Sequence, residues 1–316
     1  MLTQLLARRV LIVLGKGGVG KTAVSAALGM LAAESGKRVL IMECDGRAPM
    51  AAAFGHARSL EPVEVAPNLS LMVLDGISAF EEYLRMVLHA RVLLRAVFAN
   101  RFYQFFVQAA PGVRELMMLG KVYYEANQKS SRKTRWDLVI VDAPASGQAL
   151  SLLRMPTAAR ESFGDSIVGH EAANIARMLR DKSHCAIVAV TTPEPLAVSE
   201  TLETMAALER MRLAPAALFF NRTSADLFDA RDVAIVARAA GSSIDADSLA
   251  QLAELATREL KQAQRGRKTL AEIRAQSRVP AFKIREHSRL SGAALMHALA
   301  AELAPLATPG TAARPH

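Results

Sequence analysis

The sequence predicts an α/β fold, a doubly wound and mostly parallel sheet that carries a helical insertion. Short apolar runs rich in β-branched residues alternate with helix-favouring stretches along most of the 316 residues. A glycine-rich turn at residues 15–22 joins the first apolar run to the first helix-favouring stretch. A long helix-favouring stretch at residues 77–128 interrupts the alternation. With 51% hydrophobic and 22% charged residues, the chain has the composition of a globular protein and not of a disordered one.

Each expected strand is a short apolar run of the buried type. The first run, at residues 10–14, precedes the glycine-rich turn, and residues 23–35 have the composition of the helix that follows. Further strands are expected at residues 39–42, 69–74, 138–141, 186–190 and 217–220. From residue 226 to residue 303 we expect helices with one extended piece near residues 279–284.

The formal charge of +9 comes from basic residues that are scattered along the chain. Only residues 129–135 and 265–268 form basic clusters, and clusters this short usually lie on solvated loops or helix faces. We therefore do not expect nucleic acid as a partner, whereas a peripheral contact with an acidic membrane surface stays open. No apolar run reaches the roughly 18 residues that a membrane-spanning helix needs.

The cysteines and histidines lack the spacing of a protein-built metal site. Cys44 and Cys185 lie far apart, and the seven histidines form no HxxxH or comparable pair. We therefore expect no zinc, and any metal should arrive with a nucleotide. Cysteines used in this way fit a reducing compartment, so the expected location is cytoplasmic.

Residues 15–22 match the phosphate-binding pattern G-x-x-x-x-G-K-[ST] between an expected strand and an expected helix. In such a loop the backbone N–H groups converge on phosphate oxygens, and the helix N-terminus adds its positive dipole end. Lys21 is expected to reach the β- and γ-phosphates of ATP, and Thr22 to hold Mg²⁺. The expected nucleotide-binding residues of this segment are Gly15, Lys16, Gly17, Gly18, Val19, Gly20, Lys21, Thr22 and Ala23.

Acidic residues follow two further expected strands, at the sheet edge where open α/β folds bind ligands. Asp45 is the expected group that orients the attacking water and accepts its proton, whereas Glu43 is interpreted as a capping or loop carboxylate. Asp142 ends a later strand and is expected to hold Mg²⁺ through water. The candidate metal-side groups are thus Thr22, Asp45 and Asp142. Gly147 lies in a turn that can place a backbone N–H near the γ-phosphate.

Four segments carry a resemblance to one family: GKGGVGKT at 15–22, PGVREL at 111–116, VIVDAPASGQALSLLRMP at 139–156 and TTPEPLAVSET at 191–201. They are similar to the anion-pump and tail-anchored-protein targeting ATPases, also called ArsA-like or guided-entry ATPases. This family belongs with MinD and ParA to the deviant Walker A class of P-loop NTPases. The resemblance covers the chain from about residue 9 to about residue 299 and implies Mg²⁺-dependent hydrolysis of ATP to ADP and phosphate.

The resemblance also implies roles for individual residues. Lys16 matches the signature lysine of the class, which reaches across a dimer interface to the partner's nucleotide. The implied catalytic residues are therefore Lys16, Lys21 and Asp45. Asn221 matches an asparagine that contacts adenine, and its amide can offer the base both a donor and an acceptor. Pro280 is expected to line the same pocket.

The chain departs from the family pattern in three places. It has neither the zinc-holding CxxC of the eukaryotic targeting members nor the metalloid-binding cysteines of the arsenite members. We therefore expect no arsenite handling and no zinc-locked dimer. Residues 46–49 replace the usual Pro-Ala-His after Asp45, and Gln148 replaces a usual histidine. These two changes concern the rate and coupling of hydrolysis more than nucleotide binding.

We expect the chain to have three parts. A P-loop ATPase domain takes up residues 1–76 and 129–308, a helical insertion takes up residues 77–128, and residues 309–316 form a flexible tail. The insertion is rich in Leu, Met, Phe and Tyr. Such side chains either form its own core or, across a dimer, line a groove for a hydrophobic client such as a transmembrane segment.

The function expected from these observations is that of a dimeric ATPase switch that binds a protein client in a nucleotide-dependent way. The dimer is either a homodimer or a heterodimer with a related ATPase. One alternative is a positioning ATPase like MinD or ParA that acts on membrane or DNA, and another is a regulatory subunit paired with a related ATPase. A metabolic P-loop enzyme that activates a small acid is a further alternative, although the sequence shows no second substrate pocket.

Overall fold

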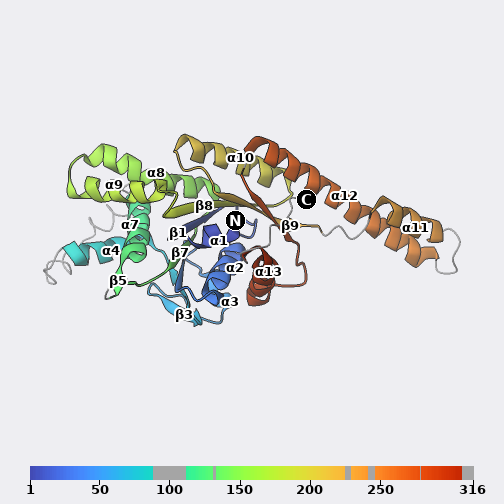
Figure 1. Cartoon of the computed structure of the whole chain (residues 1–316), viewed down its shortest axis with the longest axis horizontal. Helices are drawn as coiled ribbons and strands as arrows, with labels where there is room; N and C mark the ends of the chain where they lie inside the picture. Colours follow the sequence, from blue (N-terminus) through green and yellow to red (C-terminus); the bar gives the residue numbers. More distant parts are fainter. Residues whose placement is uncertain (88–111, 131–132, 225–228, 241–245, 278, 308–316) are drawn as a thin grey trace.

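An eight-stranded sheet forms the centre of the computed structural model, which describes residues 1–87, 112–130, 133–224, 229–240, 246–277 and 279–307. The strand order is β10-β9-β8-β1-β7-β2-β4-β3. Figure 1 shows the sheet in the middle of the molecule with helices around it. All neighbours in this sheet pair in parallel except β3 and β4. The predicted fold class is confirmed, and the antiparallel edge strand β3 is an addition that the sequence analysis did not anticipate.

The strands are buried in long stretches because helices cover both faces of the sheet, which is why they appear in the sequence as continuous apolar runs. In the central strand, Leu11 and Val13 point into one core cluster, and Val10, Ile12 and Leu14 point into the other. The strands are β1 (Val10–Leu14), β2 (Val39–Glu43), β3 (Val63–Ala66), β4 (Leu69–Val73), β7 (Leu138–Asp142), β8 (Cys185–Thr191), β9 (Ala217–Thr223) and β10 (Ala281–Arg285).

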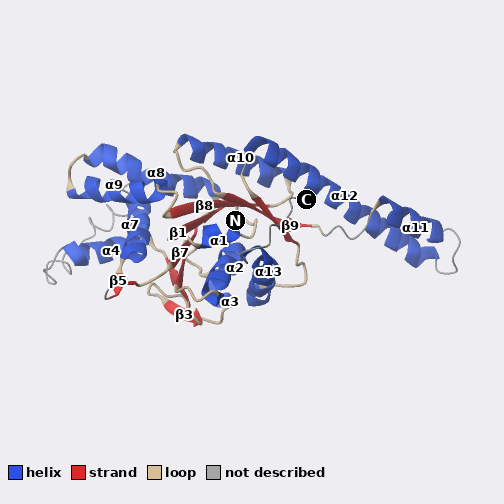
Figure 2. Cartoon of the chain, viewed as in Figure 1, coloured by secondary structure: helices blue, strands red, loops and turns tan. Residues whose placement is uncertain are grey.

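Two helical layers cover the sheet (Figure 2). One layer contains α1 (Leu2–Leu6), α2 (Lys21–Glu34), α3 (Pro49–Ala53) and α13 (Gly292–Ala307). The other contains α7 (Val113–Asn127), α8 (Ser146–Phe163), α9 (Ile167–Arg180) and α10 (Pro195–Arg210). Helix α4 (Gly76–Val87) packs on α7, and a short antiparallel pair, β5 (Lys129–Ser130) and β6 (Lys133–Thr134), follows α7.

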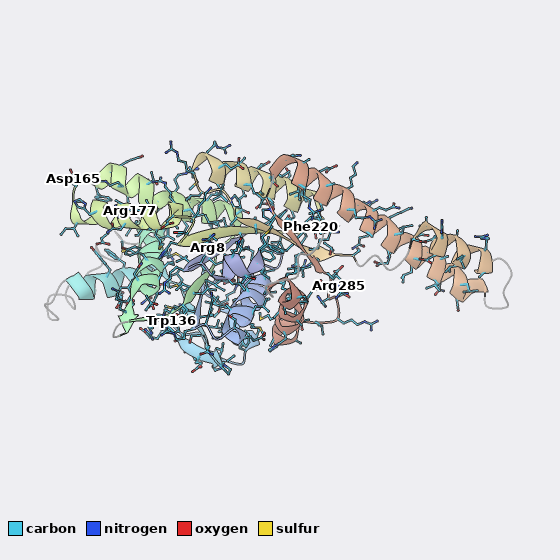
Figure 3. The ribbon with its side chains drawn as sticks, in the orientation of Figure 1. Arg8, Trp136, Asp165, Arg177, Phe220 and Arg285 are labelled. Atoms are coloured by element: carbon cyan, nitrogen blue, oxygen red, sulfur yellow. The ribbon has the colours of Figure 1, made fainter. Side chains whose placement is uncertain are left out.

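Two helices extend away from the sheet as a hairpin. They are α11 (Ala230–Ala240) and α12 (Ala246–Ser277), which pack side by side (Figure 1). The C-terminal part of α12 returns to the sheet, where Leu270 and Ile273 are buried against Phe220 of β9 (labelled in Figure 3). The sequence predicted helices in this part of the chain but not their extended arrangement.

The predicted insertion at residues 77–128 is described only in part. Its two ends form α4 and α7, while residues 88–111, which hold many of its apolar side chains, lie outside the described residues, as does the predicted tail. Leu119 and Val122 of α7 are buried in the same cluster as Val139 of β7. Helix α7 is thus part of the layer that covers the sheet, and a separate insertion domain stays a prediction. Within the described residues, none of the helices has the length and apolar character of a membrane span.

Candidate functional site

The phosphate loop connects the carboxyl end of β1 to the first turn of α2. Gly18 and Gly20 have φ angles of +86° and +91°, a left-handed conformation that favours glycine. A Cβ atom at Gly15 would collide with the carbonyl oxygen of Val190, and one at Gly20 would collide with the side-chain amide of Asn221. The loop therefore packs directly against β8 and β9, and only glycine fits at these close approaches.

A buried carboxylate lies beside the first turn of α2. Asp142, the last residue of β7, is 4% exposed and accepts hydrogen bonds of 2.7 Å from the Thr22 hydroxyl and 2.9 Å from the Ser25 hydroxyl. Burial raises the pKa of Asp142 above its ordinary value, against the opposing effects of both hydroxyls and of Lys21. The structure thus brings together Thr22 and Asp142, and their oxygens are the kind of ligand that Mg²⁺ prefers. Sequence reasoning missed Ser25, because a serine inside a helix carries no motif signal.

The Lys21 ammonium group folds back onto the loop. Its Nζ donates a hydrogen bond of 3.1 Å to the backbone oxygen of Lys16. Burial lowers the pKa of Lys21 by more than the carboxylates of Asp142 and Glu200 raise it. The Lys21 ammonium group is thus bound to the loop backbone and feels the charge of two carboxylates, and a phosphate group would compete for its three N–H donors.

The two acidic residues around the end of β2 have different partners. Glu43 is fully buried and accepts hydrogen bonds from the backbone N–H groups of Met50, at 2.8 Å, and Ala51, at 3.2 Å. Burial raises the pKa of Glu43, and these two hydrogen bonds oppose the rise. Its contacts are those of a carboxylate that caps the start of α3. Asp45 is instead bound by the Arg47 guanidinium, with Oδ2 lying 2.7 Å from Nη2 and Oδ1 lying 3.1 Å from Nε.

The sequence analysis did not predict that Arg47 is the partner of the Asp45 carboxylate. The hydrogen bonds from Arg47 lower the pKa of Asp45. Asp45 makes no hydrogen bond to Thr22 or Asp142 in the described structure, although its charge contributes to the raised pKa of Asp142. The Asp45 carboxylate is thus paired with Arg47 in the described structure, and its role in orienting water stays a prediction.

A third acidic residue joins the phosphate loop to the start of α8. Glu200 of α10 accepts a short hydrogen bond from the Ser146 hydroxyl, and its other oxygen lies 3.9 Å from Lys16 Nζ. Gly147, the predicted γ-phosphate sensor, follows Ser146 in the first turn of α8 and is exposed. Helix N-terminal N–H groups such as that of Gly147 lack intrahelical partners. Sequence reasoning missed Glu200, although it lies in one of the four segments that carry the family resemblance.

Asn221 lies near the end of β9, beneath the phosphate loop. Its side-chain Nδ2 donates a hydrogen bond of 2.8 Å to the backbone oxygen of Val19, and the residue is 5% exposed. Pro280 lies elsewhere, because it precedes β10 and its carbonyl oxygen accepts from the N–H of Leu218. Leu218 lies about 10 Å along the strand from Asn221. The structure does not bring Asn221 and Pro280 into one pocket, so the adenine role of Asn221 stays a prediction and that of Pro280 has no support from its position.

A hollow of about 870 Å³ opens at the edge of the sheet where β8, β9 and β10 end. It is lined by the segment from Thr192 to Pro195 after β8, by Arg222 of β9, by Glu286 after β10 and by one face of α12. Arg222 has a φ of +54°, which is unusual for a residue with a side chain. The sequence analysis missed these lining residues, although charged residues near the ends of parallel strands were the signal that identified Asp45 and Asp142.

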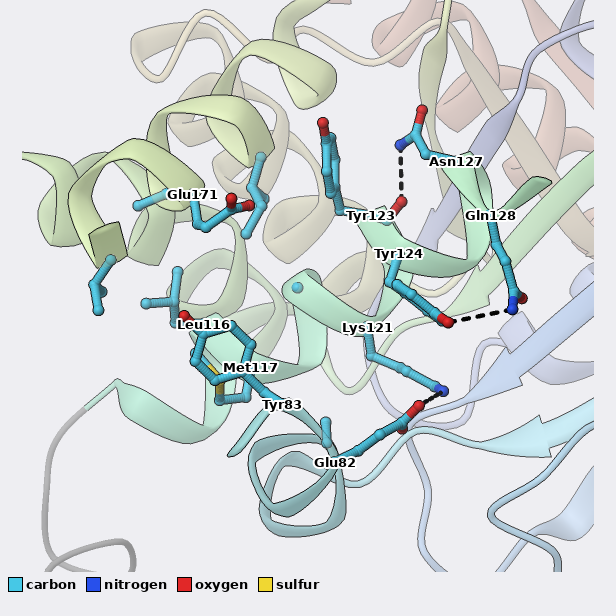
Figure 4. A pocket seen from close by; sticks show the side chains of 15 residues that line it. Glu82, Tyr83, Leu116, Met117, Lys121, Tyr123, Tyr124, Asn127, Gln128 and Glu171 are labelled. Carbon is cyan, nitrogen blue, oxygen red and sulfur yellow. Dashed lines mark hydrogen bonds and ion pairs between the residues drawn. The ribbon is translucent and has the colours of Figure 1, made fainter. Parts of the chain in front are cut away.

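A second cavity lies between α4, α7 and α9 and measures about 380 Å³ (Figure 4). Its lining is mainly aromatic and aliphatic, and includes Tyr83, Leu116, Met117, Tyr123, Val168 and Ile175. At one side Lys121 bridges Glu82, at 2.8 Å, and Glu125, at 3.0 Å. Burial alone would lower the pKa of Lys121, but the two carboxylates together raise it. The cavity is thus mainly apolar with acidic groups at its side, where one lysine pairs with two carboxylates.

Comparison with known proteins identifies related ATPases. The chain is 29% identical to the ATPase BagA of Mycobacterium tuberculosis over 248 residues, which is 76% of this chain and 72% of that protein. It is 31% identical over 147 residues to the arsenical pump-driving ATPase of Acidiphilium multivorum, covering 46% of this chain and 25% of that protein. It is 28% identical over 144 residues to the ATPase ASNA1 homolog 1 of Paramecium tetraurelia, covering 45% and 42%.

A family model shows which part of the chain carries this relationship. The model of the anion-transporting ATPases matches residues 8–170, more than half of the chain. The matched region contains the phosphate loop, Asp45 and the buried pair of Thr22 and Asp142, while Glu200 and Asn221 lie beyond it. The fold, the loop geometry and this match agree, and the chain belongs to the anion-transporting, ArsA-like family of ATPases.

Proposed function

We propose that the chain is a Mg²⁺-dependent ATPase that works as a dimer and binds a hydrophobic protein client in a nucleotide-dependent way. The observation that carries the enzymatic part is the group formed by Thr22, Ser25 and the buried Asp142 beside the phosphate loop. With the backbone of the loop and the Lys21 ammonium group, it places phosphate-binding donors beside two kinds of oxygen ligand, the hydroxyls of α2 and the carboxylate that ends β7. Such an arrangement has a complementary charge for each part of a nucleoside triphosphate and its metal.

Each residue then has a defined task when the nucleotide binds. The backbone N–H groups of the loop donate to the phosphates, and Lys21 exchanges the Lys16 carbonyl for phosphate oxygens. The Thr22 hydroxyl and Asp142 are the residues that would hold Mg²⁺, which would neutralise negative charge on the phosphates. Gly147 offers its backbone N–H from the first turn of α8, as a sensor of the γ-phosphate.

Hydrolysis also requires a group that orients the attacking water. We assign this task to Asp45, and it is available only after Asp45 has left Arg47. Because Arg47 lowers the pKa of Asp45, the carboxylate is a weak base while the pair persists. Slow turnover by the protein alone, and faster turnover when a partner or client shifts this segment, follow from that arrangement.

The dimer and the client are the finer parts of the proposal. Lys16 is proposed to reach the nucleotide of a second copy or of a related ATPase, where its charge stabilises the transition state. The cavity between α4, α7 and α9 is proposed as part of the client site, and two of its walls, α4 and α7, belong to the helical insertion predicted at residues 77–128. Its tyrosine, leucine and methionine lining can adapt to varied apolar helices.

Phosphate release and client capture test the two parts separately. Asp45→Asn should keep Mg²⁺-ATP binding and slow phosphate release, and unchanged turnover would remove Asp45 from the mechanism. For the client, a transmembrane-helix peptide with a photo-crosslinker should label the protein to different extents with ATP and with ADP. Met117→Asp, which places a charge in the cavity, should reduce labelling, whereas an acidic substitution at the exposed Leu196 of α10 should not. No labelling under either nucleotide would end the client proposal.

A further inference from the structure

One carboxylate connects three elements of the nucleotide site. Lys16 Nζ lies 3.9 Å from Glu200 Oε2, and the two side chains are 31% and 38% exposed. Glu200 Oε1 accepts a short hydrogen bond from the hydroxyl of Ser146, which is 3% exposed. Glu200 of α10 thereby joins the phosphate loop, which carries Lys16, to the first residue of α8.

Two contacts involve Lys16, one through its backbone and one through its side chain. Its backbone oxygen accepts the hydrogen bond from Lys21 Nζ, and its side chain faces Glu200. The two contacts share one competitor, because phosphate oxygens attract both ammonium groups. A triphosphate that draws Lys21 away from the Lys16 carbonyl also offers Lys16 a stronger anion than a single carboxylate.

We propose that Glu200 is a positioning residue that keeps Lys16 on its own protomer in the absence of nucleotide and thereby opposes dimer formation. The inference rests on the proposed function, in which Lys16 reaches the nucleotide of a second copy. A lysine side chain cannot pair with Glu200 and extend across an interface at the same time. Glu200 therefore sets a threshold, and dimer formation becomes favourable only when nucleotide competes for Lys16.

The strength of the contact suits a reversible restraint. Ion pairs between partly exposed side chains shift an equilibrium by up to about fivefold, and salt weakens them. In a symmetric dimer both protomers release Lys16, and independent sites contribute additively. Removing both restraints should therefore tighten the dimer by up to about twenty-five-fold.

Glu200→Gln separates the charge from the hydrogen bond. Glutamine keeps an oxygen that accepts from Ser146 but has no negative charge opposite Lys16. Glu203→Gln is the matched control, because Glu203 is an exposed acid on the same helix. Both variants keep the length of the side chain they replace.

Two measurements then test the contact and its consequence. In nucleotide-free protein, a limiting amine-acylating reagent with peptide mapping should modify Lys16 up to about five times faster in Glu200→Gln than in wild type, with no change in Glu203→Gln. Sedimentation in Mg²⁺ and a non-hydrolysable ATP analogue should show the tighter dimer in Glu200→Gln only. A merely structural role for Glu200 would loosen the dimer instead.

The outcomes distinguish this inference from the proposed function. Equal acylation of Lys16 in wild type and Glu200→Gln overturns the restraint, whatever the oligomeric state. Faster acylation with an unchanged or weaker dimer overturns the threshold role. A wild type that stays monomeric with the analogue overturns the proposed homodimer, and with it the threshold. If Glu200→Gln does not fold, Glu200→Ala, which also removes the charge opposite Lys16, should give the same acylation and sedimentation results.

Discussion

Replacing Ser25 with alanine removes one of the two hydroxyl groups that donate to the Asp142 carboxylate. Ser25 is fully buried and donates over 2.9 Å, so the carboxylate oxygen loses its partner in a site with little access to water. Hydrogen bonds to charged groups contribute about 1.5–3 kcal/mol, and alanine regains only a few tenths through its helix propensity. We expect the free energy of unfolding to fall by about 2 kcal/mol.

Urea denaturation followed by circular dichroism measures this loss. Ser162→Ala is the control, because Ser162 is an exposed serine within α8, and it should change stability little. Burial already raises the pKa of Asp142, and losing Ser25 raises it further. The folded variant therefore binds a proton more tightly than the wild type, and its deficit should shrink as the pH falls through this raised pKa. A variant as stable as the wild type at pH 7, or a deficit that widens on acidification, would refute the reasoning.

Three further perturbations test other contacts of the site and the sheet. Arg47→Ala should release Asp45 and speed phosphate release by up to about fivefold without changing nucleotide affinity, and equal or slower turnover would show that Arg47 does not restrain Asp45. Asp137, whose pKa the hydrogen bonds from Arg38 lower to about 2, should stabilise the fold above about pH 4 and lose that effect as the pH falls toward 2. Asp137→Asn should therefore lower the free energy of unfolding by about 1 kcal/mol at pH 7, since solvent screens this partly exposed pair. The same loss at every pH from about 2 to about 7 would contradict this prediction. Asn221→Ala should weaken ATP binding about tenfold in calorimetry, and an equal loss for GTP would assign Asn221 to loop support and not to base recognition.

Local sequence patterns predicted the parts of the molecule that depend on short-range chemistry. The phosphate loop required glycine at fixed spacing, and its positions coincide with left-handed backbone and close approaches to neighbouring strands. The inner strands were visible because burial on both faces demands continuous apolar runs. Asp142 was identifiable because it ends such a run, and parallel pairing then brings it to the edge where β1 also ends.

The contacts that remained hidden depend on packing between distant segments. Glu200 lies 54 residues from Ser146 in the sequence, and only the packing of α10 on α8 brings them together. The pairing of Arg47 with Asp45 arises in a loop where the family pattern is lost, so the resemblance could not predict it. Pro280 stays a prediction without support from its position, because it precedes an edge strand and parallel strands bind ligands at their carboxyl ends.

The central claim is that the segment between β1 and α2 binds a triphosphate together with Mg²⁺. Isothermal titration calorimetry of the folded protein with ATP tests it most directly. We expect saturable binding in Mg²⁺, weaker binding after chelation of the metal, and none in Lys21→Ala. Absence of binding by the folded wild type, or undiminished binding by folded Lys21→Ala, would contradict the account.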